Sequence, residues 1–146
     1  MKGGDNMKPL RTIEFQFDYE CAPIWLCGDE FGPWLISSEG YFVDSLDDPS
    51  IKVHEERLKG EVKLEQKVKL IDEIYLKLWD INEFPDGEPY LGFEDEREKK
   101  DFFDACDYVI KRMKEIFGEE FSVHESTKRL INERSWGCKT TERMII

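Results

Sequence analysis

The spacing of apolar residues changes sharply along this chain, and that change constrains the fold more than any other feature. In the segment RTIEFQFDY, residues 11–19, aliphatic and aromatic residues alternate with polar ones. Alternation with a period of two predicts a half-buried β-strand. Between Glu61 and Asn82 the apolar residues recur at steps of three and four, which predicts an amphipathic helix. On this helix Glu73 and Lys77 lie four residues apart, and we expect them to pair.

A hairpin is predicted after the first strand. The apolar segments IWLC (24–27) and WLIS (34–37) flank the turn-rich sequence GDEFGP, so residues 29–31 should lie at the tip between two strands. Aromatic residues in strands belong to the core more often than to a binding surface. We expect Trp25 in the core, but Trp34 stands beside a Gly-Pro turn and two acids, and for Trp34 core and surface are both open.

The rest of the chain supplies a second helix and two more short strands. The segment FPDGEPYLG (84–92) ends the first helix because it contains two prolines and an Asp-Gly turn pair. A second amphipathic helix is predicted from Glu94 to Phe117, with acids in its first turn and Gly118 as its C-terminal cap. The segments GYFV (40–43) and EFSVHE (120–125) are typical of short strands.

This order of elements predicts an α+β fold. We expect a two-layer domain with an antiparallel or mixed sheet of three to five strands and two long helices packed on one face. With 146 residues the chain is long enough for one core, so residues 11–125 are predicted to form a single domain. Residues 1–10 are then an N-terminal extension, and residues 126–146 are either an ordered appendage or a tail.

The acidic residues are concentrated in two segments. The formal net charge is -12, and residues 29–56 carry eight acids and one lysine while residues 83–98 carry seven acids and one arginine. Residues 126–146, in contrast, hold five basic residues and two acids. Such a distribution repels nucleic-acid phosphates and attracts a basic partner. Solubility is the alternative explanation, because many cytosolic proteins are acidic.

Motifs for catalysis or metal binding are not found. The four cysteines are irregularly spaced, and the chain lacks a G-x-S-x-G turn and a phosphate-binding glycine loop. Asp44, Asp47 and Asp48 could in principle hold a divalent cation, but their spacing is not that of an EF-hand. We therefore expect no catalytic residue, no metal and no cofactor. Without an apolar run of about 18 residues or a signal-peptide core, we expect a cytoplasmic protein that does not enter the membrane.

Aromatic residues in or beside the acidic segments indicate a protein-binding surface, because interfaces favour aromatic anchors within a charged rim. The predicted partner-binding residues are Asp29, Glu30, Phe31, Trp34, Asp44, Asp47, Asp48, Asp86, Glu88, Glu94 and Asp95.

The motif FDYECAPIW (17–25) resembles the N-terminal signature of small bacterial immunity proteins, in which an acidic-aromatic strand end is followed by proline, an aliphatic residue and tryptophan. The segments LWDINEF, YLGFEDERE and FGEEFSV are similar to that layout as well, so the resemblance covers residues 13–123. It implies a non-enzymatic inhibitor that binds a cognate toxin of contact-dependent growth inhibition or a related polymorphic toxin system. Such proteins often present an acidic surface to a basic nuclease domain. The C-terminal residues after His124 depart from this layout.

Three functions follow in order of preference. The first is an immunity protein that neutralises a basic toxin, such as a nuclease, by binding it. The second is an intracellular adaptor or regulatory module that binds proteins, and the third is a small hydrolase or nuclease with scattered carboxylates.

Overall fold

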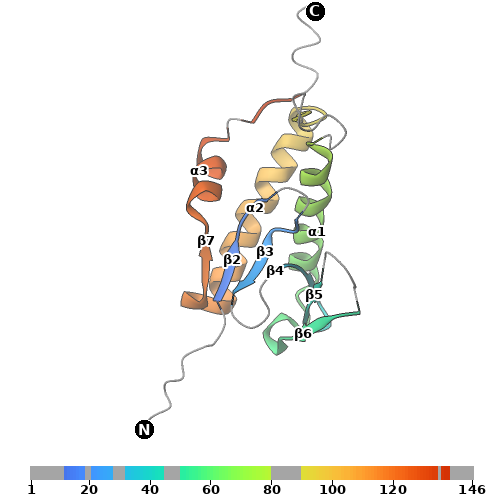
Figure 1. Ribbon diagram of the computed structural model, residues 1–146, viewed down its shortest axis with the longest axis vertical. Coiled ribbons are helices and arrows are strands. Elements are labelled where there is room, and N and C mark those ends of the chain that lie inside the picture. The colour runs from blue at the N-terminus through green and yellow to red at the C-terminus, as the bar shows by residue number, and fades with distance from the viewer. Residues whose placement is uncertain are drawn as a thin grey trace, which may run out of the picture.

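The computed structural model describes residues 12–18, 21–27, 32–44, 50–79, 90–134 and 136–138. These residues form one six-stranded sheet with helices packed on one of its faces (Figure 1). In spatial order the strands are β6 (Lys52–His54), β5 (Tyr41–Asp44), β4 (Gly32–Ser37), β3 (Ile24–Cys27), β2 (Thr12–Phe15) and β7 (Phe121–Val123). Neighbouring strands are antiparallel except for β2 and β7, which are parallel.

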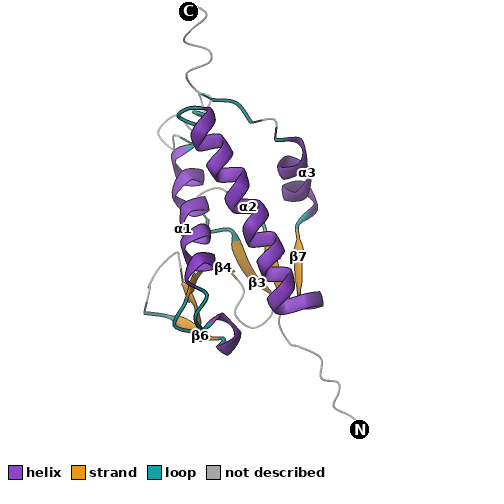
Figure 2. Cartoon of the chain, turned by 180° about the vertical axis from the view of Figure 1, so that it is seen from behind, coloured by secondary structure: helices purple, strands orange, loops and turns teal. Residues whose placement is uncertain are grey.

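Two long helices cover the inner face of the sheet, as Figure 2 shows from the helical side. They are α1 (Val62–Lys77) and α2 (Glu96–Phe117), and a shorter helix, α3 (Glu125–Glu133), follows β7. The predicted α+β two-layer architecture is confirmed, with a mixed sheet and both long helices on one face. None of the described helices is long and apolar enough to cross a membrane.

The sheet has six strands instead of the predicted three to five. The strand that the sequence does not suggest is β6, which has only three residues, Lys-Val-His, and shows no informative alternation. It pairs with β5, so that Tyr41 lies opposite His54 and Phe42 opposite Val53. The backbone amide of Glu55 just beyond it donates to the carbonyl of Gly40, which brings the strand end back against the β4–β5 turn.

The register of the sheet determines which of two tryptophans lies in the core. Trp34 lies opposite Ile24, on the face that packs against the helices, and its exposed fraction is only 7%. Trp25 lies opposite Glu14 and Pro33 on the outer face, where it is half-buried and its Nε1 donates to the carbonyl of Gln16 at 3.2 Å. Trp25 is therefore not in the core, contrary to expectation. Trp34 is a core residue, which corrects its assignment as a surface anchor.

Helix boundaries follow local signals in the sequence. Asp95 is the N-cap of α2, since its side chain accepts a hydrogen bond from the backbone amide of Glu98 at 2.8 Å. Gly118 ends the helix with a φ of 60°, a left-handed conformation that favours glycine, and its amide donates to the carbonyl of Lys114. On α1 the helix ends at Lys77, before the predicted end at Asn82, which lies outside the described residues.

The C-terminal residues complete the core. Residues 126–146 were expected to be an appendage or a tail; of these, 126–133 belong to α3, and Trp136 and Cys138 lie against the body of the fold. Ile131 of α3 is 4% exposed, and the hydroxyl of the buried Thr127 accepts a hydrogen bond from the backbone amide of Phe17 at 3.0 Å. Residues 139–146 lie outside the described residues.

Candidate protein-binding groove

The structure describes four of the eleven predicted partner-binding residues. Trp34 is in the core, as described above, and Asp44 lies half-buried at the end of β5 opposite Trp34. Glu94 and Asp95 are exposed at the start of α2. The other seven lie outside the described residues: Asp29, Glu30, Phe31, Asp47, Asp48, Asp86 and Glu88.

Glu94 and Asp95 line a groove between the second half of α1 and the first turns of α2. The groove has a volume of about 300 Å³. We call it the acidic groove and define it by the residues Leu70, Glu73, Ile74, Lys77, Glu94, Asp95, Arg97, Glu98 and Asp101. Five carboxylates and two cations give this set a formal charge of -3.

A network of hydrogen bonds holds the α2 side of the acidic groove. The carboxylate of Glu98 accepts from the backbone amide of Glu94 at 2.9 Å through one oxygen and from Nζ of Lys77 at 2.8 Å through the other. Asp95 in turn accepts from the amide of Glu98. The pKa of Lys77 is raised, first by its hydrogen bond to Glu98 and further by the carboxylates of Glu94 and Glu73. The lysine ammonium therefore joins α1 to the start of α2.

This contact corrects one expectation about α1. Lys77 bonds across the groove to Glu98, although its position four residues after Glu73 predicted a pair along the helix. Glu73 is exposed and lines the groove. A helical i, i+4 pair gains only a few tenths of a kcal/mol, so a tertiary partner with better geometry displaces it easily.

The acidic groove has an apolar floor. Ile74 is 4% exposed and belongs to the core, and Leu70 is half-buried against it. An apolar centre surrounded by charged side chains is the usual anatomy of a protein-binding site, because the centre excludes water and the rim provides specificity. The groove can therefore take an apolar side chain flanked by lysine or arginine.

A C-terminal strap, residues 136–138, supports the start of α2. The carbonyl of Gly137 accepts from the backbone amide of Phe93 at 3.1 Å and from the hydroxyl of Tyr90 at 3.0 Å. The ring of Trp136 lies 6.3 Å from that of Phe93, centroid to centroid, within a larger aromatic cluster. Since Glu94 and Asp95 directly follow Phe93, the strap fixes the backbone from which they project.

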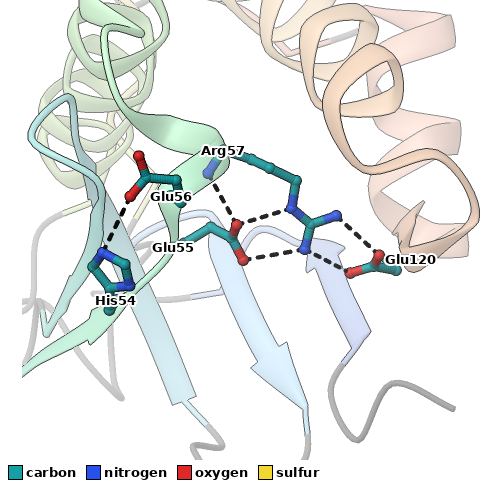
Figure 3. Close-up of polar contacts among 5 residues, drawn as sticks. All are labelled: His54, Glu55, Glu56, Arg57 and Glu120. Carbon is teal, nitrogen blue, oxygen red and sulfur yellow. Dashed lines mark hydrogen bonds and ion pairs between the residues drawn. The ribbon is translucent and has the colours of Figure 1, made fainter. Parts of the chain in front are cut away.

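The other conspicuous charge cluster ties together the ends of two 3-10 turns, η1 (Glu56–Leu58) and η3 (Gly118–Glu120). Figure 3 shows Arg57 between two carboxylates. Its Nε lies 2.8 Å from Glu55, whose side chain is 8% exposed, and its Nη1 lies 3.0 Å from Glu120. The guanidinium also stacks 4.5 Å above the ring of Phe117.

This cluster suits a structural role. Both carboxylates face a guanidinium that cannot lose its proton, so neither is arranged to exchange protons with a substrate. The hydrogen bonds to Glu55 and Glu120 raise the pKa of Arg57 further, with that to Glu55 contributing most. His54 makes a separate, exposed contact with Glu56, at 3.5 Å.

The groove residues that the sequence does not reveal are Glu73, Glu98 and Asp101. They are spread over two helices, and in each helix they fit the pattern of an ordinary solvated face. Only the packing of α1 against α2 brings them beside Glu94 and Asp95.

Within the described ranges, no three or more His, Cys, Asp or Glu side chains are placed to hold a metal ion. All four cysteines are free thiols, of which Cys106 and Cys138 are buried. Burial raises the pKa of the Cys106 thiol well above its ordinary value. Comparison of this chain with protein-family models, with curated proteins and with solved structures found no match in any of the three.

Proposed function

We propose that this protein is a cytoplasmic immunity protein that neutralises a cognate bacterial toxin by binding a basic surface of it. The observation that carries the proposal is the acidic groove, where a net charge of -3 surrounds an apolar floor. The reason to propose a toxin as the partner is that the layout of the sequence resembles that of small immunity proteins, as described above.

Electrostatics favours this function. Opposite potentials raise association rates toward about 10⁸–10⁹ M⁻¹s⁻¹ at low salt, and fast capture is what an inhibitor of a lethal protein requires. Four of the nine groove residues, Glu94, Asp95, Arg97 and Glu98, belong to the acidic segment 83–98, in which seven acids accompany one arginine. Apolar contacts on the partly exposed Leu70 then slow dissociation.

A binding role also fits how the carboxylates are used. Asp95 caps α2 and Glu98 bonds Lys77, so these two hold the shape of the groove. The exposed acids Glu73, Glu94 and Asp101 supply its outward charge. Such a division suits recognition of a cationic surface.

The experiment is co-expression with the product of the gene immediately upstream, followed by affinity purification and a growth assay. The test variant is Glu73→Lys/Glu94→Lys/Asp101→Lys. Its control is Glu39→Lys/Glu119→Lys/Glu125→Lys, which reverses exposed acids outside the groove. Each reversal adds two charges, so both triple variants move the formal net charge from -12 to -6.

The wild type and the control should copurify with the upstream product and restore growth, whereas the groove variant should lose both. The proposal fails if the upstream product is not retained by the wild-type protein. An adaptor, the second function considered, would instead retain a protein that has no effect on growth when expressed alone.

A further inference from the structure

The second half of α2 carries a surface of opposite charge. Two grooves flank it, one shared with α1 and one with α3 and β7, and Figure 2 shows α2 running between these helices. The first groove has a volume of about 500 Å³ and is lined in part by Val62, Lys63, Tyr108 and Arg112. The second has a volume of about 260 Å³. Lys111 lines both, so they adjoin.

The second groove combines lysines with an apolar floor. Its lysines are Lys111, Lys114 and Lys128, all exposed, and its floor consists of Ile110, Val123 and Ile131. We call the two grooves together the cationic face.

Acids balance part of the positive charge of this face: five cations and three carboxylates line its two grooves, a formal net charge of +2. Asp107, which also lines the second groove, is held by Arg134 through both of its oxygens, at 2.8 and 2.6 Å. Among the described residues, no ion pair of Lys111, Lys114 or Lys128 is formed. Three lysines thus point at solvent around one groove of a protein whose formal net charge is -12.

In the first groove Arg112 is paired with carboxylates, and an aromatic ring lies beside a lysine. Arg112 bonds Glu61 through its Nε at 2.9 Å and Glu115 through its Nη1 at 3.1 Å. Lys63 places its ammonium 4.8 Å from the ring centre of the half-buried Tyr108. Val62 beside it is 53% exposed and adds apolar surface to the groove.

Size and charge together define what this face can bind. The second groove is smaller than the roughly 300–1,000 Å³ of a typical small-molecule pocket, and it continues into the first at Lys111. An extended chain segment that places side chains in both grooves matches this shape. Nucleic acid fits less well because its phosphate backbone offers no aliphatic group to cover the apolar floor of the second groove.

We propose that the cationic face is a second docking surface and that its occupant is an acidic segment of another protein that carries aliphatic side chains. Its carboxylates pair with Lys111, Lys114 and Lys128, while its aliphatic groups cover Ile110, Val123 and Ile131. The surface is separate from the acidic groove: along α2, Lys111 and Lys114 lie ten and thirteen residues after Asp101, a rise of about 15–20 Å. The proposal therefore does not depend on the proposed function.

Fluorescence anisotropy with the full-length protein tests this at low and physiological salt. The probe is a fluorescein-labelled peptide of six glutamates and two leucines, and a second peptide has serine in place of leucine. The test variant is Lys111→Glu/Lys128→Glu. The control, Lys69→Glu/Lys99→Glu, makes the same change in net charge at lysines that line neither groove. Circular dichroism checks the fold of both, and Lys111→Gln/Lys128→Gln replaces the test variant if it does not fold.

The wild type should bind the leucine peptide in a salt-sensitive manner. The test variant should weaken that binding about tenfold or more, and the control should leave it within about threefold, because pairing is local. The serine peptide should bind at least about fivefold more weakly, since it cannot cover the apolar floor.

Three kinds of result would overturn the proposal. In the first, the leucine peptide fails to bind the wild type or loses affinity equally for the test and control variants. Another is binding of a single-stranded DNA probe as tightly as the peptide. The third is a wild-type dimer in sedimentation that Lys111→Glu/Lys128→Glu dissociates, because the occupant would then be a second copy of this chain.

Discussion

Replacing Trp34 and Trp25 separately by alanine gives a direct test of the sheet register. Trp34 faces the helices and is 7% exposed, whereas Trp25 lies half-buried on the outer face. A tryptophan side chain buries about 150–250 Å². At about 25 cal/mol per Å² the transfer contribution of Trp34 is roughly 4–6 kcal/mol, and alanine retains a small part of it. We therefore expect Trp34→Ala to lower the free energy of unfolding by about 3–5 kcal/mol, the range of such core truncations.

The cost of Trp25→Ala should be lower. Part of the ring contacts solvent in the folded protein. On this open face water fills the space left by truncation and replaces the hydrogen bond that Nε1 donates to the carbonyl of Gln16, so no cavity forms. We expect a cost of about 2 kcal/mol. The two variants should thus differ by roughly 2 kcal/mol, with Trp34→Ala the less stable.

Urea unfolding followed by far-UV circular dichroism measures this difference. With a slope of about 2 kcal/mol per molar urea, the midpoint should fall by roughly 1.5–2.5 M for Trp34→Ala and by about 1 M for Trp25→Ala. Equal shifts, or a larger shift for Trp25→Ala, would mean that the register places the wrong tryptophan against the helices.

Three other variants test the polar contacts. Arg57→Met should destabilise the fold by about 2–3 kcal/mol in thermal unfolding, less than for a fully buried pair because Arg57 is partly exposed. Adding Glu55→Gln should restore part of this stability, because it removes the buried charge that has lost its partner. Asp95→Ala should cost about 1 kcal/mol in urea unfolding by removing the N-cap of α2. The hydrogen bond from Arg112 lowers the pKa of Glu61 below its ordinary 4.5. The ionised Glu61 therefore contributes fully to the free energy of unfolding above about pH 4.5, and this contribution is lost as the pH falls through the lower pKa of the folded state. The wild type should therefore exceed Glu61→Gln in stability at pH 7 by an amount that shrinks below about pH 4.5, as measured by melting at a series of pH values.

Much of the fold follows from periodicity, because burial on one side leaves a clear pattern. The alternation around Phe15 and the helical stripes of both long helices identify their elements and their inward faces. Gly118 ends α2 as predicted, because glycine accommodates the backbone conformation of a C-terminal cap. At the other end the helix begins at Glu96, two residues after the predicted start at Glu94, and Asp95 is its N-cap. The prediction that Trp25 lies in the core was wrong because the segment IWLC is apolar at every position. Its pattern alone therefore does not show which side of the strand faces the core.

The candidate site was only partly predictable. Charge density along the sequence points to the region of Glu94 and Asp95, but the acids that complete the groove lie on helices that meet only in the tertiary structure. The strap depends on contacts between residues that are far apart in the sequence. The ring of Trp136 packs against those of Phe17, just after β2, and Phe102 of α2. The sequence around Trp136 has no periodicity that predicts these contacts. The ion pair of Lys77 with Glu98, in place of the expected Glu73, likewise depends on how α1 packs against α2.

The central claim is that the acidic groove steers a basic partner, and stopped-flow association rates with the copurified upstream product test it most directly. The variants are again the groove triple, with lysine at positions 73, 94 and 101, and the control triple at positions 39, 119 and 125. At low salt we expect the groove variant to associate at least about tenfold more slowly than the wild type, and the control within about threefold. The gap should narrow as salt rises. Equal association rates for the two triple variants would contradict the claim, because their net charges are the same and only the position of the charge differs.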